Sequence, residues 1–264
     1  MEGAKDELRF VEVAPAGGTP RRSIAFRRRL PRGAGALRPG IVFLGGFASD
    51  MRGSKASFLD EWAQREGRAL LRFDYSGHGE SGGRFEDGAI GDWLEDSLAA
   101  FDAATEGPQI LVGTSMGGWI ALLLTQRLAA TGRRPHALVL IAPAVDFTEE
   151  LLWASADAEA RRAILQQGVW PRPSRYAPHP TPITRRLVEE GRAHLLLGGL
   201  IRTHAPVTIL QGMQDEDVPY AHALRLVERL PADPVSLSLI VDGDHRLSRR
   251  QDLDHLVATI EALG

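Results

Sequence analysis

The sequence contains no cysteine among its 264 residues. This absence excludes disulfides, metal sites built from thiolates and a cysteine nucleophile. It is typical of a protein that works in a reducing compartment. The first residues, MEGAKDELRFVEV, have the composition of neither a secretory signal nor a basic transit leader. From these two features we expect a cytoplasmic protein.

A long apolar run and a strong net charge are also missing. No stretch approaches the roughly 18 uninterrupted apolar residues that a membrane span needs, so we expect no span. The net charge of -3 implies no bulk attraction to nucleic acid, and no nucleic-acid partner is expected. An arginine-rich stretch, residues 21–39, fits a solvated edge strand whose charges block aggregation, and a contact with an anionic partner is the alternative.

Apolar runs alternate with segments of helical periodicity along most of the chain. Continuous Val, Ile and Leu strands between helices are typical of a parallel sheet covered on both faces. Residues 8–14 and 23–30 alternate apolar and polar, and they predict an antiparallel hairpin on one edge. We therefore expect an α/β fold with a mostly parallel central sheet. The predicted strands are 41–46, 69–77, 109–115, 136–144, 206–212 and 235–243, and the predicted helices are 55–67, 91–105, 116–130, 221–230 and 249–264.

A long interval, from about residue 146 to residue 204, interrupts this alternation. It holds two helical stretches on either side of a proline-rich run, residues 170–182. An insertion of this length inside a compact domain is usually functional. We expect a single domain over residues 1–264, in which the interval forms a small helical cap over the strand ends.

The stretch VGTSMGG places Ser115 between glycines where an apolar strand ends and an apolar helix begins. The pattern Gly113-Thr-Ser115-Met-Gly117 is G-x-S-x-G in the strand–turn–helix context that this motif requires. A serine on such a corner has a strained backbone, and neighbouring side chains would collide with it unless they were glycines. We interpret Ser115 as a nucleophile. A glycine-rich turn that merely packs closely is the alternative.

A serine hydroxyl is a weak nucleophile at neutral pH and needs a base, which in turn needs an orienting acid. The segment LQGMQDEDVPY follows one late predicted strand, and VDGDHRLS follows the next. Because ligand sites lie beyond the carboxyl ends of parallel strands, we predict Asp215 as the acid and His245 as the base. Asp217 fits better as a charge at the start of the next helix. His78, in DYSGHGES, is interpreted as a loop or rim residue.

An acyl-transfer site also needs N–H donors for an oxyanion. The Met116 N–H lies at the start of the helix after the serine, and Phe47 in LGGFASD supplies the second predicted donor. The glycine-rich LGG stretch matches neither phosphate-binding fingerprint. No histidine pair or carboxylate cluster has the spacing of a metal site, so we expect no metal and no cofactor.

The combination of FLGGFASDMRGSKA, RFDYSGHGESGG, GPQILVGTSMGGW, GVWPRPSRY, LQGMQDEDVPY and DGDHRLSRR resembles the α/β-hydrolase family. Within that family the chain is similar to the branch that contains α/β-hydrolase domain protein ten. The resemblance implies acyl-protein thioesterase or acyl-glucuronide esterase activity. It also implies Ser115, Asp215 and His245 as a catalytic triad, with Phe47 and Met116 at the oxyanion hole.

We therefore expect a serine hydrolase that cleaves small-molecule or protein-linked esters or thioesters. A C–C bond hydrolase or a perhydrolase on the same triad, and a non-catalytic binding protein, are the alternatives. Residues of the cap are expected to contact the substrate, although packing within the cap explains most of the apolar ones better. These candidates are Trp153, Trp170, Arg172, Arg175 and Tyr176.

Overall fold

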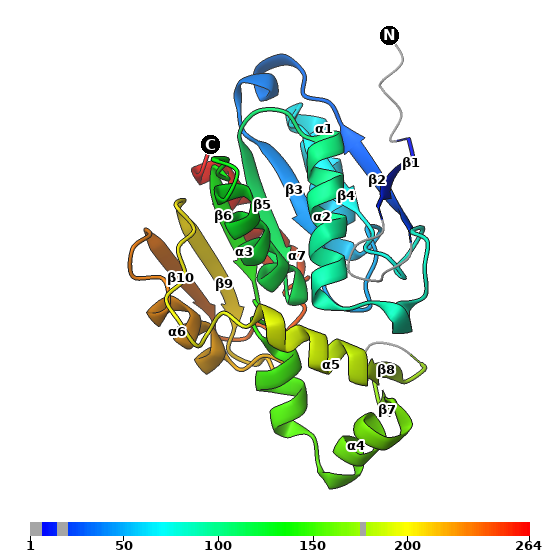
Figure 1. The fold of residues 1–264 in the computed structure, drawn as a ribbon. Helices are drawn as coiled ribbons and strands as arrows, with labels where there is room; N and C mark the ends of the chain where they lie inside the picture. Colours follow the sequence, from blue (N-terminus) through cyan, green and yellow to red (C-terminus); the bar gives the residue numbers. More distant parts are fainter. Residues whose placement is uncertain (1–6, 15–20, 175–177) are drawn as a thin grey trace.

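An eight-stranded sheet forms the centre of the protein in a computed structural model that describes residues 7–14, 21–174 and 178–264 (Figure 1). The strand order is β1-β2-β4-β3-β5-β6-β9-β10. β1 and β2 are antiparallel to their neighbours, and the remaining pairs are parallel. The strands are β1 (Arg9–Val13), β2 (Arg22–Arg29), β3 (Gly40–Leu44), β4 (Leu70–Phe73), β5 (Gln109–Thr114), β6 (Ala137–Ile141), β9 (Val207–Gly212) and β10 (Val235–Ile240).

Helices cover both faces of this sheet and bury the side chains of its strands. β3, β4 and β6 are buried along their whole length, which explains their continuous apolar sequences. The predicted α/β fold class is confirmed. On one face lie α2 (Ile90–Ala104), α3 (Met116–Ala129) and α6 (Tyr220–Glu228), and on the other lie α1 (Ser54–Glu66) and α7 (Arg250–Ala262).

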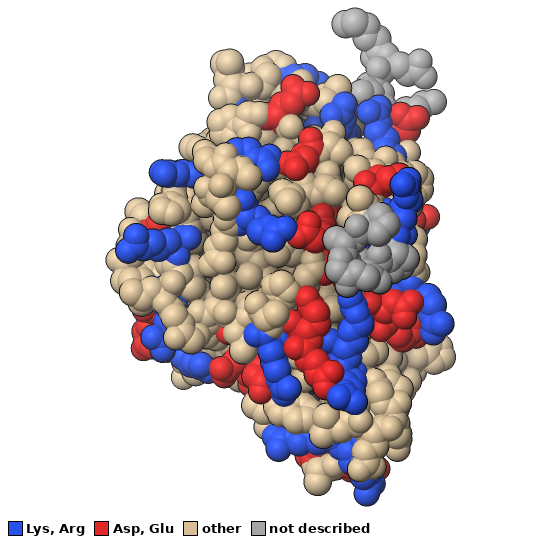
Figure 2. Space-filling view, viewed as in Figure 1, with Lys and Arg blue, Asp and Glu red and all other residues tan. Residues whose placement is uncertain are grey.

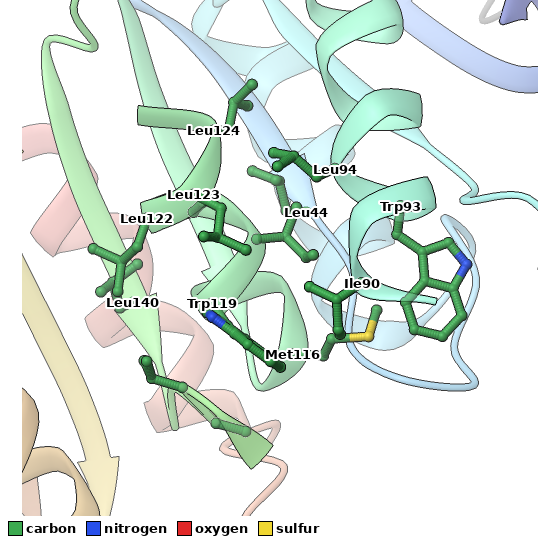
Figure 3. Close-up of a cluster of buried hydrophobic side chains, with 14 of the residues drawn as sticks. Leu44, Ile90, Trp93, Leu94, Met116, Trp119, Leu122, Leu123, Leu124 and Leu140 are labelled. Carbon is green, nitrogen blue, oxygen red and sulfur yellow. The ribbon is translucent and has the colours of Figure 1, made fainter. Parts of the chain in front are cut away.

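The larger of the two apolar cores lies between the sheet and helices α2 and α3 (Figure 3). Leu44 from the sheet, Trp93 from α2 and Trp119 from α3 are all fully buried there. Within the described ranges, none of the helices combines the length and the apolar composition needed to span a bilayer.

The arginine-rich stretch does not form an edge strand, because β2 lies between β1 and β4. Two of its arginines are paired with carboxylates of the neighbouring helices. Arg22 donates to Asp96 over 2.8 Å, and Arg29 contacts Asp60. Basic and acidic side chains also lie intermixed over the face drawn in Figure 2. These two charges of β2 therefore form internal ion pairs, and β1 occupies the edge of the sheet.

The interval between β6 and β9 extends beyond the carboxyl ends of the parallel strands, at the bottom of Figure 1. Its proline-rich run contributes two short strands that the sequence did not predict, paired antiparallel. The elements are a π-helical turn (Thr148–Trp153), α4 (Ala158–Arg162), a second π-helical turn (Ala163–Gln167), β7 (Val169–Arg172), β8 (Thr181–Thr184), α5 (Arg185–Gly191) and a 3-10 turn (Arg192–His194). Two further 3-10 turns lie elsewhere, at Gly33–Leu37 and Phe85–Asp87.

The two ends of this interval are joined by one carboxylate. Asp146, at the start, accepts hydrogen bonds from the N–H groups of Leu196 (2.8 Å) and Leu197 (2.8 Å) at the end. Trp119 of α3 also donates to the carbonyl of His194 over 3.1 Å. The start of the interval and the segment around Leu196 thus lie side by side, close to the helix that follows Ser115.

Candidate active site

Ser115 occupies the corner between β5 and α3 with a φ of 53° and a ψ of −120°. Residues with a Cβ rarely adopt a positive φ, so the surrounding structure must hold this conformation. The Ser115 N–H donates to the Ile141 carbonyl over 2.8 Å. The Ser115 carbonyl accepts from the N–H groups of Gly118 (2.9 Å) and Ala144 (3.1 Å). These bonds fix the backbone that carries the predicted nucleophile.

The glycines on either side of Ser115 are required by close backbone contacts. A Cβ added at Gly113 would lie 2.4 Å from the Gly117 carbonyl oxygen. A Cβ added at Gly117 would lie 2.2 Å from the Leu44 carbonyl oxygen. Both distances are far below van der Waals contact. The G-x-S-x-G pattern therefore reflects a corner that is packed directly against β3.

The fold brings Ser115, His245 and Asp215 together from three different loops. His245, after β10, lies with Nε2 3.1 Å from the Ser115 Oγ. Its Nδ1 lies 2.8 Å from Asp215 Oδ2, in the loop after β9. A carboxylate only accepts, so Nδ1 carries the proton, and the unprotonated Nε2 can accept one from the serine hydroxyl.

The second carboxylate oxygen of Asp215, Oδ1, accepts hydrogen bonds from the backbone of its own loop. Oδ1 accepts from the N–H groups of Asp217 (2.9 Å) and Val218 (2.8 Å). Gln211 also donates to Oδ2 over 3.2 Å. These donors satisfy a buried negative charge and aim one oxygen at His245. Asp217, the rival acid, instead faces Arg172 over 4.0 Å.

The two predicted oxyanion donors lie beside the serine corner. A Cβ added at Gly46 would lie 3.4 Å from the Ser115 Cβ, so the loop before Phe47 touches the corner. Met116 follows Ser115 as the first residue of α3. Among the described residues, no backbone or side-chain acceptor is bonded to the Phe47 or Met116 N–H. The role of both groups as oxyanion donors stays a prediction.

The predicted substrate residues divide into three groups. Trp153 is half-buried beneath the guanidinium groups of Arg161 (5.2 Å) and Arg192 (5.3 Å), which is a packing role within the interval. Trp170 packs against the larger apolar core. Arg172 lies near the site through Asp217. Arg175 and Tyr176 lie outside the described residues.

Asp215, Asp217 and His245 form a group whose carboxylate and imidazole donor atoms lie within 4.8 Å of one another. Three such donors are the minimum of a metal site. However, the hydrogen bond between His245 and Asp215 already uses one possible metal-ligating atom of each residue. The sequence did not indicate this group, because its members come from two separate loops.

Sequence reasoning missed a set of contacts between the segment after β4 and the loop that carries Phe47. Tyr75, His78 and Asp74 all bond to backbone groups of that loop. The only signal in the sequence was that DYSGHGES follows a strand end. Nothing local to that segment indicates which loop it contacts.

Three features define the fold as that of an α/β-hydrolase. They are the strand order, the antiparallel strands β1 and β2 at the start of the chain, and a serine with a positive φ on a strand–turn–helix corner. A family model described as serine aminopeptidase, S33, matches residues 36–182, more than half of the chain. A palmitoyl-protein thioesterase from Bos taurus, ABHD10, is 37% identical over 226 residues, covering 85% of this chain and 72% of that protein.

Solved structures give the same result. A protein from Agrobacterium vitis S4 is 47% identical with a TM-score of 0.92, covering 97% of this chain and 98% of that one. Mouse α/β-hydrolase domain-containing protein 10 is 33% identical with a TM-score of 0.83 over the same shares of both chains. The chain therefore belongs to the α/β-hydrolases, in the ABHD10 branch, and it is a hydrolase. The family resemblance seen in the sequence is confirmed.

The same comparison contradicts the cytoplasmic location that we expected. All five curated mammalian relatives are named as mitochondrial proteins. The expectation is wrong because it rested on cysteine content and on the composition of the first residues. A cellular address is read from a targeting segment and is not set by the physical properties of a folded domain.

Proposed function

We propose that the protein hydrolyses carboxylic esters and thioesters through an acyl-enzyme on Ser115. The observation that carries this proposal is the continuous chain from the Ser115 Oγ to His245 (3.1 Å) and from His245 to Asp215 (2.8 Å). Such a chain provides a nucleophile with a base of the correct tautomer. Binding alone would need neither.

In this mechanism His245 Nε2 takes the hydroxyl proton while the Ser115 Oγ bonds to the acyl carbon. The carbonyl oxygen becomes an oxyanion that accepts from the Phe47 and Met116 N–H groups. The intermediate collapses, the bond from carbon to the leaving oxygen or sulfur breaks, and the leaving group takes the proton from His245. Water then attacks the acyl-enzyme by the same route, and the acid and free Ser115 are released.

The interval of residues 146–204 acts in this proposal as a cap of a single domain that spans residues 1–264. Two features support a role in choosing the substrate: it extends past the strand ends, and its Arg172 lies 4.0 Å from Asp217. The ABHD10 relatives are named as palmitoyl-protein thioesterases, which favours acylated substrates. Arg172 would suit a substrate carboxylate, such as that of an acyl glucuronide.

The decisive variant is Ser115→Ala. We expect turnover of p-nitrophenyl esters to fall by about 10⁴ or more, because the nucleophile is lost. Ser236→Ala, which removes an exposed serine of β10, is the matched control and should keep wild-type turnover. Near-normal activity of Ser115→Ala would contradict the proposed mechanism.

A second measurement separates the alternative functions. The wild-type protein should label with a fluorophosphonate, and Ser115→Ala should not. Failure of the wild type to label would favour a binding protein. The ratio of kcat/KM among short esters, palmitoyl thioesters and acyl glucuronides defines the substrate class, and product analysis identifies a C–C bond hydrolase or a perhydrolase.

A further inference from the structure

The loop of residues 45–51, which we call the oxyanion loop because it carries Phe47, is held from outside at three points. The Tyr75 hydroxyl donates to the Gly45 carbonyl over 3.2 Å. His78 Nε2 accepts from the Ala48 N–H over 3.2 Å. Asp74 Oδ1 accepts from the Met51 N–H over 2.6 Å. The shape of the oxyanion loop therefore depends on the segment that follows β4.

His78 can make its contact only in one protonation state. Its Nδ1 lies 3.1 Å from the Ser76 carbonyl, which only accepts, so Nδ1 carries the proton. Nε2 is then unprotonated and accepts from Ala48. The side chain is buried, and desolvation lowers the pKa of His78 to about 4. The imidazole is therefore neutral at physiological pH, as the contact requires.

The partner that orients His78 is itself held by buried bonds. The Ser76 N–H and hydroxyl donate to Asp96 Oδ2 over 2.9 and 2.6 Å. Trp93 donates to the Ser76 carbonyl over 3.2 Å. Asp96 is paired with the buried Arg22. The buried hydrogen bonds of Ser76 thus fix the orientation of the imidazole, and they hold Nε2 in place beside the oxyanion loop.

Ala48 needs such support because its backbone is left-handed, with a φ of 55°. A residue with a Cβ reaches this region at a cost of about 1 kcal/mol or more. The turn at Ala48 directly follows the Phe47 N–H. The rings of Phe47 and His78 also share two neighbours, since each lies 5.0 Å from Phe85 and within 6 Å of Trp93.

We infer that His78 is a positioning residue for the oxyanion hole: it holds Ala48 in its left-handed turn so that the Phe47 N–H faces the acyl oxygen. This inference rests on the proposed acyl-enzyme mechanism. His78 touches neither the substrate nor the triad in this role. It acts through the backbone of the loop, and the contact matters most when charge develops on the substrate oxygen.

The test compares His78→Phe, which keeps an aromatic ring without an acceptor, with His78→Gln, whose amide oxygen can replace Nε2. His78→Phe should lower kcat about 10- to 100-fold while KM changes less than about threefold, because an oxyanion donor is displaced. A trifluoromethyl ketone forms a charged adduct with Ser115, and its inhibition constant should rise by the same factor. His78→Gln should recover most of both losses.

His222→Phe is the matched control, because His222 is equally buried and bonds to the Val145 carbonyl through Nε2. It should lose stability without the paired change in kcat and inhibitor affinity. His78→Leu provides a second acceptor-free variant if His78→Phe does not fold.

Wild-type kcat and wild-type inhibitor affinity in a folded acceptor-free variant would overturn the inference. An equal fall in kcat for His222→Phe and His78→Phe would do the same. If Ser115→Ala is inactive in the same assays, the mechanism stands and only the role of His78 is rejected. Full activity of Ser115→Ala would reject the mechanism first.

Discussion

At the scale of residues, position within a loop separates Asp215 from its neighbours. Asp215, Glu216 and Asp217 are consecutive acids after β9, and all three are chemically able to orient a histidine. Only Asp215 is buried with one oxygen against His245 and the other against two backbone N–H groups. Glu216 is exposed. The hydrogen bonds of the loop therefore determine which acid meets the base.

Asp215→Asn should lower kcat by about 10⁴, because the amide NH₂ would face His245 and favour the wrong tautomer. The amide oxygen would still satisfy the backbone donors that Asp215 Oδ1 accepts from. Glu216→Gln is the control and should retain wild-type turnover. Steady-state kinetics on p-nitrophenyl esters measure both variants. Equal losses in the two would argue against Asp215 as the orienting acid.

At the scale of elements, the corner between β5 and α3 is packed backbone against backbone. Alanine is usually favoured over glycine in a helix by about 1 kcal/mol. At Gly117 this preference is overridden, because a Cβ would lie 2.2 Å from the Leu44 carbonyl oxygen of β3. Gly198, in contrast, has nothing within 4 Å of an added Cβ. The close contact with β3 therefore determines that a glycine is needed at position 117.

Gly117→Ala should destabilise the protein by about 1–3 kcal/mol, because the start of α3 must move away from β3. The same movement shifts Ser115 and should lower kcat. Gly198→Ala should leave both properties unchanged. Thermal unfolding and ester turnover of the two variants test this expectation. A fully stable and active Gly117→Ala protein would contradict this expectation, because it would show that the corner can accommodate a Cβ at position 117.

At the scale of the whole molecule, burial couples stability to pH through His78. Desolvation lowers the pKa of this imidazole from 6.5 to about 4, while the nearby Asp50 charge opposes the shift. As pH falls from 6.5 to 4, His78 becomes protonated in the unfolded chain but stays neutral in the folded protein. The contribution of His78 to stability is therefore fully present above pH 6.5 and is lost down to pH 4.

The free energy of unfolding should fall by about 2–3 kcal/mol between pH 7 and pH 4.5 because of His78. Burial raises the pKa of Asp74, Asp96 and Asp146, which acts in the opposite direction. The difference between wild type and His78→Gln isolates the histidine. Urea unfolding at both pH values measures it. Parallel losses in the two proteins would mean that His78 does not titrate as its burial requires.

Much of the fold was predictable because buried parallel strands must be apolar along their whole length. The pair β7–β8 was not, because its residues are mostly half-exposed and Pro171 lies opposite Pro182. Proline lacks an N–H, so such a run does not resemble a strand. The position of β2 was also missed, since its arginines resemble those of an exposed edge.

The candidate site also has local features that the sequence predicts and long-range contacts that it does not. The sequence by itself determined the alternation of strands and helices and the glycine-flanked corner at Ser115, because periodicity and backbone sterics act within a few residues. The order of the late strands indicated His245 as the base, but only the tertiary structure decided that it lies 3.1 Å from Ser115, 130 positions away, and that His78 contacts Ala48 across 30 positions. Contacts at such separations depend on how the whole core packs, and no local pattern encodes them.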